Sequence, residues 1–270
     1  MRSSSAGTLA RTQESWEALL REHPGEELAL SGEIFAVANT VASQRGLARA
    51  LTDPSREDAD RVALVRGVFS RAVSGEVLDL LSGLARDRWS KDSDLTTALG
   101  ELAAQTILVG VQRQGSLDLA EEQLYRTVRI LRDNRNLRVS LADRAHPVET
   151  RRALAQRVFS GSEPAVRLLI ERAVELAPAQ PLIRTLSHFI DLAAERANRL
   201  VASVTVAVPL TQGQEERLTR ILSERYGREV NVHSAIDTSI IGGLRIRVGE
   251  EVIDGTLAAR IKEVRQALGS

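Results

Sequence analysis

Apolar residues recur at steps of three and four along most of the first two hundred positions. Ile34, Val37 and Val41 are one such series. This spacing places the series on one face of an α-helix. A helix with one apolar face needs neighbours to cover that face. The pattern therefore predicts packed helices from about residue 9 to residue 199.

Proline, often next to glycine or aspartate, divides this region into short and medium segments. The breaks fall at positions 23–25, 52–54, 146–147 and 177–178. A proline ring fixes φ and removes a backbone donor, so helices end near it. The segments between the breaks are long enough for helices that bundle together.

An internal repeat with a constant offset of 90 residues runs through the helical region. Val68-Phe69-Ser70 returns as Val158-Phe159-Ser160, and Arg61 returns as Arg151. Matches that hold one register without a gap indicate two copies of one helical unit. The predicted domains are a first helical bundle at 1–112, a repeated helical domain at 113–199 and a C-terminal module at 200–270.

The apolar period changes to two after the helical region, which predicts strands. The apolar positions of the three strands are Leu200, Ala202, Val204, Val206, Val208 and Leu210, then Val230, Val232 and Ile236, then Leu244, Ile246 and Val248. Between the first two strands, Thr211 and Gln214 have the spacing of a capping box. That box starts a helix with an apolar face of Leu218, Ile221 and Leu222.

The third strand is followed by a turn at 249–251, a short return strand at 252–253 and a last helix. That helix has Leu257, Ile261, Val264 and Leu268 on one side. The C-terminal region is thus a small β-α-β-β-α module, whose few strands need helices to cover them. The predicted fold class is mainly α with a small α+β C-terminal module, that is, two related helical bundles followed by that module.

Composition narrows the classes of partner. The 270 residues include 43% apolar residues, enough for a core, and 36 basic and 36 acidic residues. A balanced charge argues against a partner held by bulk charge, such as nucleic acid or an anionic membrane. The absence of cysteine excludes disulfides and thiolate chemistry. No apolar run approaches the roughly 20 residues of a spanning helix, so we expect membrane association only through a partner.

Candidate catalytic and metal-binding motifs are weak. Gly242-Gly243 lacks a following Lys-Ser/Thr and precedes a strand, which favours a bulge or turn over a phosphate loop. Asp237 is then a turn residue rather than a general base. The four histidines are scattered without metal-ligand spacing. We expect no catalytic residue, cofactor or metal.

Two sets of residues are candidates for a partner interface. Arg126, Arg129 and Arg132 recur every three residues in the second copy, which is basic overall, whereas the first copy is acidic. They form either a solvated helix face or a surface for an acidic partner; RNA is disfavoured because aromatic residues are sparse. Trp16, together with Leu19 and Leu20, either lines a groove that receives a partner or packs in the core.

The run from residue 230 to residue 249 resembles the signature of the delta subunit family of F-type ATP synthases, which includes the mitochondrial oligomycin-sensitivity-conferring protein. The matching positions are Val230, Val232, Ile236, Asp237, Ile240, Gly242, Gly243, Leu244, Ile246, Arg247 and Gly249. Residues 252–256 and 51–54 are also similar to the family. A common form of the subunit carries the helical unit once, whereas this chain resembles a long form with two copies.

The resemblance implies a non-catalytic peripheral-stalk (stator) subunit of F1Fo ATP synthase at the cytoplasmic face of the cell membrane, with one copy per complex. It implies contacts with N-terminal segments of the alpha subunits and with the b subunits, and neither nucleic-acid binding nor direct membrane insertion. Such a subunit couples proton-driven rotation to ATP synthesis. The alternative is a helical-repeat scaffold unrelated to ATP synthase, and a small transferase is a third hypothesis.

Overall fold

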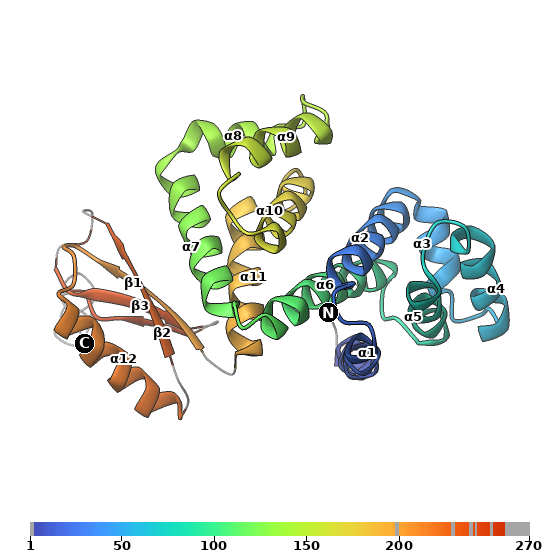
Figure 1. Cartoon of the computed structure of the whole chain (residues 1–270), viewed down its shortest axis with the longest axis horizontal. Coiled ribbons are helices and arrows are strands. Elements are labelled where there is room, and N and C mark those ends of the chain that lie inside the picture. Colours follow the sequence, from blue (N-terminus) through green and yellow to red (C-terminus); the bar gives the residue numbers. More distant parts are fainter. Residues whose placement is uncertain are drawn as a thin grey trace, which may run out of the picture. The chain divides into compact units, whose positions relative to one another are not determined.

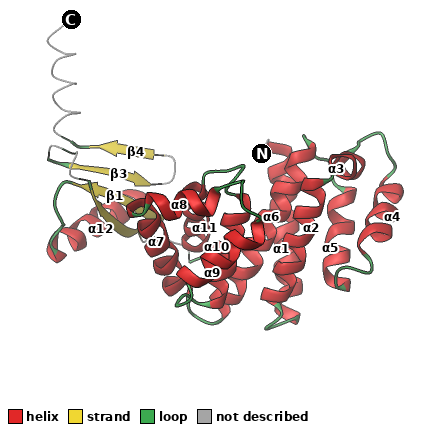
Figure 2. Cartoon of the chain, turned by 90° about the horizontal axis from the view of Figure 1, so that it is seen from above, coloured by secondary structure: helices red, strands yellow, loops and turns green. Residues whose placement is uncertain are grey.

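The chain forms two compact units in a computed structural model, which describes residues 3–197, 200–227, 230–237, 240, 242–248 and 251–256 (Figure 1). The first unit holds Met1–Ser116 and Glu163–Arg172, and the second holds Leu117–Ser162 and Ala173–Ser270. The predicted class, mainly α with a small α+β module, is confirmed (Figure 2). The three predicted domain ranges remain a prediction.

The helices of the first unit are α1 (Ser3–Glu22), α2 (Glu27–Ser43), α3 (Arg45–Thr52), α4 (Asp58–Phe69), α5 (Gly75–Arg86) and α6 (Asp92–Arg113). The helical part of the second unit contains α7 (Leu117–Asp133), α8 (Arg135–Ala142), α9 (Val148–Val158) and α11 (Leu182–Arg196). Helix α10 (Pro164–Leu176) contributes its first part to the first unit and its last part to the second.

The repeat in the sequence is also a repeat in the structure. Shifting the bounds of α2 and α3 by 90 residues gives the bounds of α7 and α8. The turns match as well: Asp53 Oδ1 accepts the backbone N–H of Ser55 at 2.9 Å, and Asp143 Oδ1 accepts that of Ala145 at 2.9 Å. Each aspartate closes the same local turn after its short helix. The two copies therefore share backbone geometry as well as residues.

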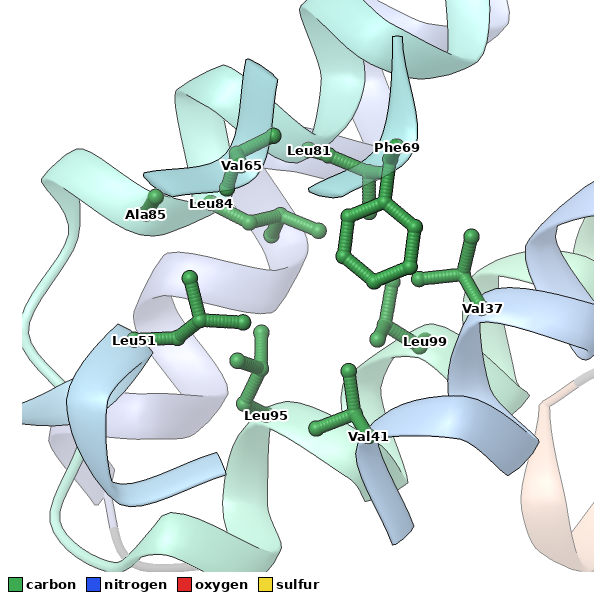
Figure 3. Close-up of a pocket in the computed structure, with 10 residues that line it drawn as sticks. All are labelled: Val37, Val41, Leu51, Val65, Phe69, Leu81, Leu84, Ala85, Leu95 and Leu99. Carbon is green, nitrogen blue, oxygen red and sulfur yellow. The ribbon is translucent and has the colours of Figure 1, made fainter. Parts of the chain in front are cut away.

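The core of the first unit lies between α2, α3, α4, α5 and α6. Figure 3 shows an apolar cavity there, lined by Val37, Val41, Leu51, Val65, Phe69, Leu81, Leu84, Ala85, Leu95 and Leu99. Its volume of about 10 Å³ holds about one water-sized sphere. Ile34 and Val37 are buried, so the helix face predicted from their spacing is confirmed. This cavity is a small packing gap rather than a ligand site.

A buried carboxylate ties three helix ends together in the first unit. Glu27, 4% exposed, forms an ion pair with the guanidinium of Arg113 at the end of α6. Arg113 also donates to the carbonyl of Leu20 near the end of α1, at 2.8 Å. The second carboxylate oxygen of Glu27 accepts the backbone N–H of Gly25 at 3.0 Å. These bonds offset the cost of burying the charge.

A buried arginine occupies the same repeat position in both copies. Arg61 donates to backbone carbonyls at the C-terminal ends of α3 and α5, at 3.2 and 3.3 Å. Arg151 donates to carbonyls in the last turns of α8 and α10, at 3.2 and 2.6 Å. Carbonyls at a helix C-terminus lack partners within the helix, and the helix dipole favours a cation there. Each arginine therefore joins two helix ends in its own copy.

A four-stranded sheet completes the second unit. It is built from β1 (Leu200–Val206), β2 (Val230–Ile236), β3 (Leu244–Val248) and β4 (Glu251–Asp254), in the order β2-β1-β3-β4. Strand β1 is parallel to β2, and the other neighbours are antiparallel. Helix α12 (Gln212–Tyr226) covers one face (Figure 1). The buried core there is Ala202, Val204, Val206, Leu222, Val230, Ile246 and Val248.

Three details of the predicted module are wrong. The first strand ends at residue 206 rather than 210, and Val208 is 69% exposed, since the chain turns before Pro209. Ile236 is 58% exposed rather than inward because it is the last residue of an edge strand. Ile221 is 46% exposed because it lies about 100° around the helix from the buried Leu222.

Other details of the module agree with the sequence. The capping box is present, with Thr211 Oγ1 accepting the backbone N–H of Gln214. Leu244, Ile246 and Val248 turn inward, as predicted, although Leu244 is only partly buried. The predicted last helix at 257–268 lies outside the described residues.

Candidate functional site

Two of the three candidate interface residues on α1 lie in the core. Trp16 is 3% exposed, and its Nε1 donates to Thr106 Oγ1 on α6 at 2.8 Å. Leu20 is fully buried and Leu19 is half-buried. For Trp16 and Leu20 the structure supports core packing, the second of the two interpretations. Only Leu19 retains surface that a partner is able to contact.

The three arginines on α7 are exposed. Arg126 pairs with Glu122 one turn earlier, with 2.6 Å between nitrogen and oxygen, and both side chains are more than half exposed. Arg129 and Arg132 are exposed as well. A pair in water contributes little to stability, so these charges remain available to a partner. Their role as an interface stays a prediction.

The signature residues of the C-terminal module shape its sheet and turns. Val230 and Ile246 are core residues, and Val232 packs against the same core. Gly242 and Gly243 have φ of 72° and 83°, a region that residues with a Cβ rarely adopt. The turn interpretation of the glycine pair is therefore confirmed.

Gly243 has a second, steric requirement. A Cβ at this position would lie 2.4 Å from the carbonyl oxygen of Gly255 and 2.9 Å from the Cα of Thr256. Two distant segments of backbone pass each other here, and Gly255 N donates to the carbonyl of Leu244 at 2.9 Å. The glycine therefore allows the start of β3 to lie against the chain that follows β4.

Asp237 is a turn residue, as predicted. Its N–H donates to the carbonyl of Val206 at 2.8 Å, and its carbonyl accepts the N–H of Ile240 at 3.1 Å. Ile240 is buried, whereas Arg247 on β3 is exposed. Gly249 lies outside the described residues.

A cluster that the sequence did not predict joins α7 to β2 in the second unit. Glu121 Oε1 lies 2.8 Å from His233 Nε2, and the Glu121 side chain is only 2% exposed. The ring of Tyr125 stacks on the imidazole, with centroids 4.2 Å apart and planes 20° apart. The Tyr125 hydroxyl donates to the carbonyl of Ser234 at 3.3 Å. We call Glu121, Tyr125 and His233 the α7–β2 cluster.

The signals for this cluster in the sequence are weak. Glu121 and His233 are 112 residues apart, so no local spacing brings them together. Glu121 and Tyr125 are four residues apart, which places them on one face of α7. His233 follows Val232, which packs against the core beneath α12, along β2. Successive side chains of a strand point to opposite faces, and this alternation indicates that His233 faces away from α12.

The titration of Tyr125 tests this geometry. Burial raises the pKa of Tyr125 above its usual value near 10, and a hydrogen bond to Glu251 raises that of Tyr226. These are the only two tyrosines. In Tyr226→Phe, where Tyr125 is the remaining tyrosine, we expect the tyrosinate absorbance to appear at a higher pH than for an exposed tyrosine. The free energy of unfolding of the second unit should fall as the pH rises through that range, because the folded state holds the Tyr125 proton more tightly than the unfolded state does. An ordinary titration curve would contradict a buried hydroxyl.

The part of the chain that the structure describes has neither a metal-binding cluster nor a membrane-spanning helix. No group of three or more His, Asp or Glu side chains there is arranged to hold a metal ion. None of the helices in the described ranges is both long and apolar enough to cross a membrane. Among the features described above, the glycine turn at 242–243 and the α7–β2 cluster have the most specific side-chain and backbone contacts.

Comparisons with known proteins agree with one another. The family "ATP synthase delta (OSCP) subunit" matches residues 104–268. A protein named ATP synthase subunit delta from Beutenbergia cavernae is 39% identical and covers 99% of both chains. The subunit from Streptomyces griseus is 35% identical over 99% of both chains, and that from Kineococcus radiotolerans is 37% identical over 90% of this chain and 89% of its own.

A distant likeness is found among solved structures. One chain of a Toxoplasma gondii mitochondrial ATP synthase hexamer is 17% identical, with a TM-score of 0.40, and the alignment covers 62% of this chain and 95% of that chain. A TM-score of this size supports no conclusion about this chain.

Proposed function

The chain belongs to the ATP synthase delta (OSCP) subunit family, and from this premise we propose that it joins the alpha/beta head of the enzyme to the b-subunit stalk. As a stator subunit, it holds the catalytic head still while proton flow turns the rotor. A head without an anchor would turn with the rotor and make no ATP. The alternative of a scaffold unrelated to ATP synthase does not survive the family match.

The second helical copy and the C-terminal module carry the ordinary subunit. This assignment is supported by the family match, which begins at residue 104 and continues to residue 268. The first copy is then an addition, and the relatives from Beutenbergia and Streptomyces, aligned over 99% of both chains, carry it too. The first copy therefore extends the surface that the subunit offers to the head.

Two partners are proposed for these parts. N-terminal segments of the alpha subunits bind the helical domains, and the b subunits bind the C-terminal part. An amphipathic segment laid against a helical bundle buries enough apolar surface for a stable contact. The exposed arginines of α7 suit an acidic surface on the head or stalk, because charge complementarity sets orientation and speeds association. The subunit then lies at the cytoplasmic face of the membrane, held by its partners and performing no catalysis.

The proposal is tested with the full chain and a labelled peptide that copies the N-terminus of the alpha subunit of the same organism. We expect saturable binding at about micromolar concentration, with a scrambled peptide as the control and no ATP hydrolysis by the isolated chain. Absence of binding to both the alpha peptide and the b subunit would contradict the proposed role.

Charge reversal tests the α7 surface separately. In the triple variant Arg126→Glu, Arg129→Glu, Arg132→Glu, we expect weaker binding of the complete head or of the b subunit, with a loss of salt dependence. The matched control reverses three arginines that are exposed on the first copy, Arg56, Arg66 and Arg71. Equal effects of the two sets would show that the charges of α7 have no special role.

A further inference from the structure

The two faces of the sheet in the C-terminal module differ in chemistry. Helix α12 packs on one face, where Val204, Ile246 and Val248 are buried (Figure 1). Successive side chains of a strand point to opposite faces, so Arg247, between Ile246 and Val248, lies on the other face. Its side chain is exposed. We call this second face, which carries Arg247, the arginine face.

The middle of the arginine face holds three side chains that are free to donate hydrogen bonds. Ser203 on β1 is the direct cross-strand neighbour of Arg247, and Thr205 lies two residues further along β1 on the same face. Among the described residues, none forms a side-chain hydrogen bond or ion pair with these three. Directly opposite residues have Cβ atoms roughly 5 Å apart. A carboxylate placed beside Arg247 is therefore able to accept bonds from its guanidinium and from the Ser203 hydroxyl together.

The described acid on this face already has partners. Asp254 on β4 pairs with Arg245, which precedes Arg247 by two residues on β3, with 3.1 Å between nitrogen and oxygen. The other carboxylate oxygen of Asp254 accepts the backbone N–H of Thr256 at 3.1 Å and its hydroxyl at 2.7 Å. Among the described residues of the arginine face, Arg247 thus keeps a positive charge without a counter-charge.

An apolar side chain borders Arg247 on the other side. Val252 on β4 is its direct cross-strand neighbour and is 51% exposed. The α7–β2 cluster uses the same face at β2, but β1 separates β2 from β3 in the sheet. A helix that presents an acidic residue next to an apolar one is therefore able to contact Arg247 and Val252 together.

Charge limits which segment binds this face. The last residues of the chain, 257–270, contain Arg260, Lys262 and Arg265 but only one acid, Glu263, so that segment is basic overall and is repelled by Arg247. A second copy of the chain, docked through the same face, would bring a second unpaired arginine. The charge of the face is instead complementary to an acidic segment of a different protein.

We propose that the arginine face binds an acidic, amphipathic helix of the b subunit, with Arg247 and Ser203 holding one of its carboxylates. This inference rests on the proposed function, which assigns the b subunits to the C-terminal part of the chain. An arginine binds a carboxylate through two parallel N–H groups, so the contact fixes the orientation of the helix as well as its place. Val252 packs against the apolar side of the same helix.

A thiol footprint tests where the b subunit binds. Because the chain has no cysteine, Val252→Cys introduces a single thiol beside Arg247. We expect a maleimide to modify it quickly in the free chain and much more slowly once the soluble part of the b subunit of the same organism is bound. The control is Ile221→Cys on α12, which is 46% exposed and should react equally fast with and without b.

Three results of the footprint would overturn the proposal. Slow modification of the thiol from Val252→Cys in the free chain at every concentration would show that the chain's own end covers the face. Slow modification only at high concentration of the chain would show that a second copy does so. Protection by the alpha/beta head but not by b would assign the face to the head.

Charge reversal tests the role of Arg247 itself. Arg247→Glu should weaken binding of the b subunit about tenfold at low salt, and the loss should shrink as salt rises. Arg247→Lys keeps the charge but loses the two parallel donors, so an intermediate loss is expected. The matched control is Arg220→Glu, which reverses an exposed arginine on α12 and should leave the affinity unchanged. Equal losses in Arg247→Glu and Arg220→Glu, or no loss in either, would overturn the contact.

A charge swap identifies the partner carboxylate and separates this inference from the proposed function. With the Arg247→Glu chain, replacing the acidic residues of the b helix by lysine one at a time should restore most of the affinity at one position. Hydrogen exchange of the β3 amides checks that the variant keeps its sheet. If no position restores binding, the contact at Arg247 is overturned while the stator role stands. Failure of the unaltered chain to bind both b and the alpha peptide would instead overturn the proposed function.

Discussion

Gly243→Ala is expected to destabilise the C-terminal module by about 3 kcal/mol, combining an unfavourable positive φ with a steric clash. The new Cβ would lie 2.4 Å from the carbonyl oxygen of Gly255, so backbone must move. That movement breaks the hydrogen bond from Gly255 to Leu244 and separates β3 from the chain after β4. Hydrogen exchange of the β1 and β3 amides in the full chain measures the effect, expected to be about a hundredfold acceleration.

Two other glycines in the same module provide controls. Gly227 has φ of 68° but no atom within 4 Å of an added Cβ, so Gly227→Ala should cost about 1 kcal/mol from the backbone conformation alone. Gly213 lies in the first turn of α12 with open space around it, so Gly213→Ala should be neutral or stabilising. If Gly243→Ala and Gly227→Ala lowered the free energy of unfolding equally, the steric clash with the backbone of Gly255 would contribute nothing at Gly243.

Arg151→Met should destabilise the second unit by about 3 kcal/mol, because two buried carbonyls lose their donor. Arg151 is 5% exposed and donates to Leu141 and Val174. No water replaces the guanidinium at such a site without opening the helix ends. Hydrogen exchange of α8, α9 and the end of α10 should accelerate, while that of the first unit should change little.

Arg61→Met is the matching change in the first copy and should accelerate exchange in α3, α4 and α5 instead. The surface control is Arg157→Met on α9, whose side chain is exposed; its expected effect is within about 0.5 kcal/mol. An effect of Arg151→Met as small as that of Arg157→Met would contradict the bridging role. Equal acceleration of exchange by Arg61→Met in both units would contradict a local role for this arginine.

Helical periodicity, the repeat and the sheet pattern could be read from the chain alone because each is a local property. The spacing of Ile34, Val37 and Val41 predicted a buried face, and all three are buried. The capping box at Thr211 was predicted because both of its hydrogen bonds join residues three apart. The limits of burial were not predictable in the same way: Ile236 and Ile221 fit the apolar patterns, but Ile236 ends an edge strand and Ile221 lies on the flank of α12.

The candidate site shows the same division. The resemblance in residues 230–249 identified the family, which the comparisons confirmed, and the glycine pair was correctly interpreted as a turn. The choice between groove and core for Trp16 depended on its hydrogen bond to Thr106, which lies 90 residues away. The α7–β2 cluster was missed because its members come from segments with no shared pattern.

The sequence by itself determined where helices and strands form, that one helical unit occurs twice, and which family the signature resembles. Neighbouring residues set these properties through backbone preference and apolar spacing. Only the tertiary structure decided that Gly243 faces Gly255, that Arg151 joins two helix ends and that His233 meets Glu121. These contacts depend on how distant segments approach each other in space, and burial then makes each unpaired polar group costly.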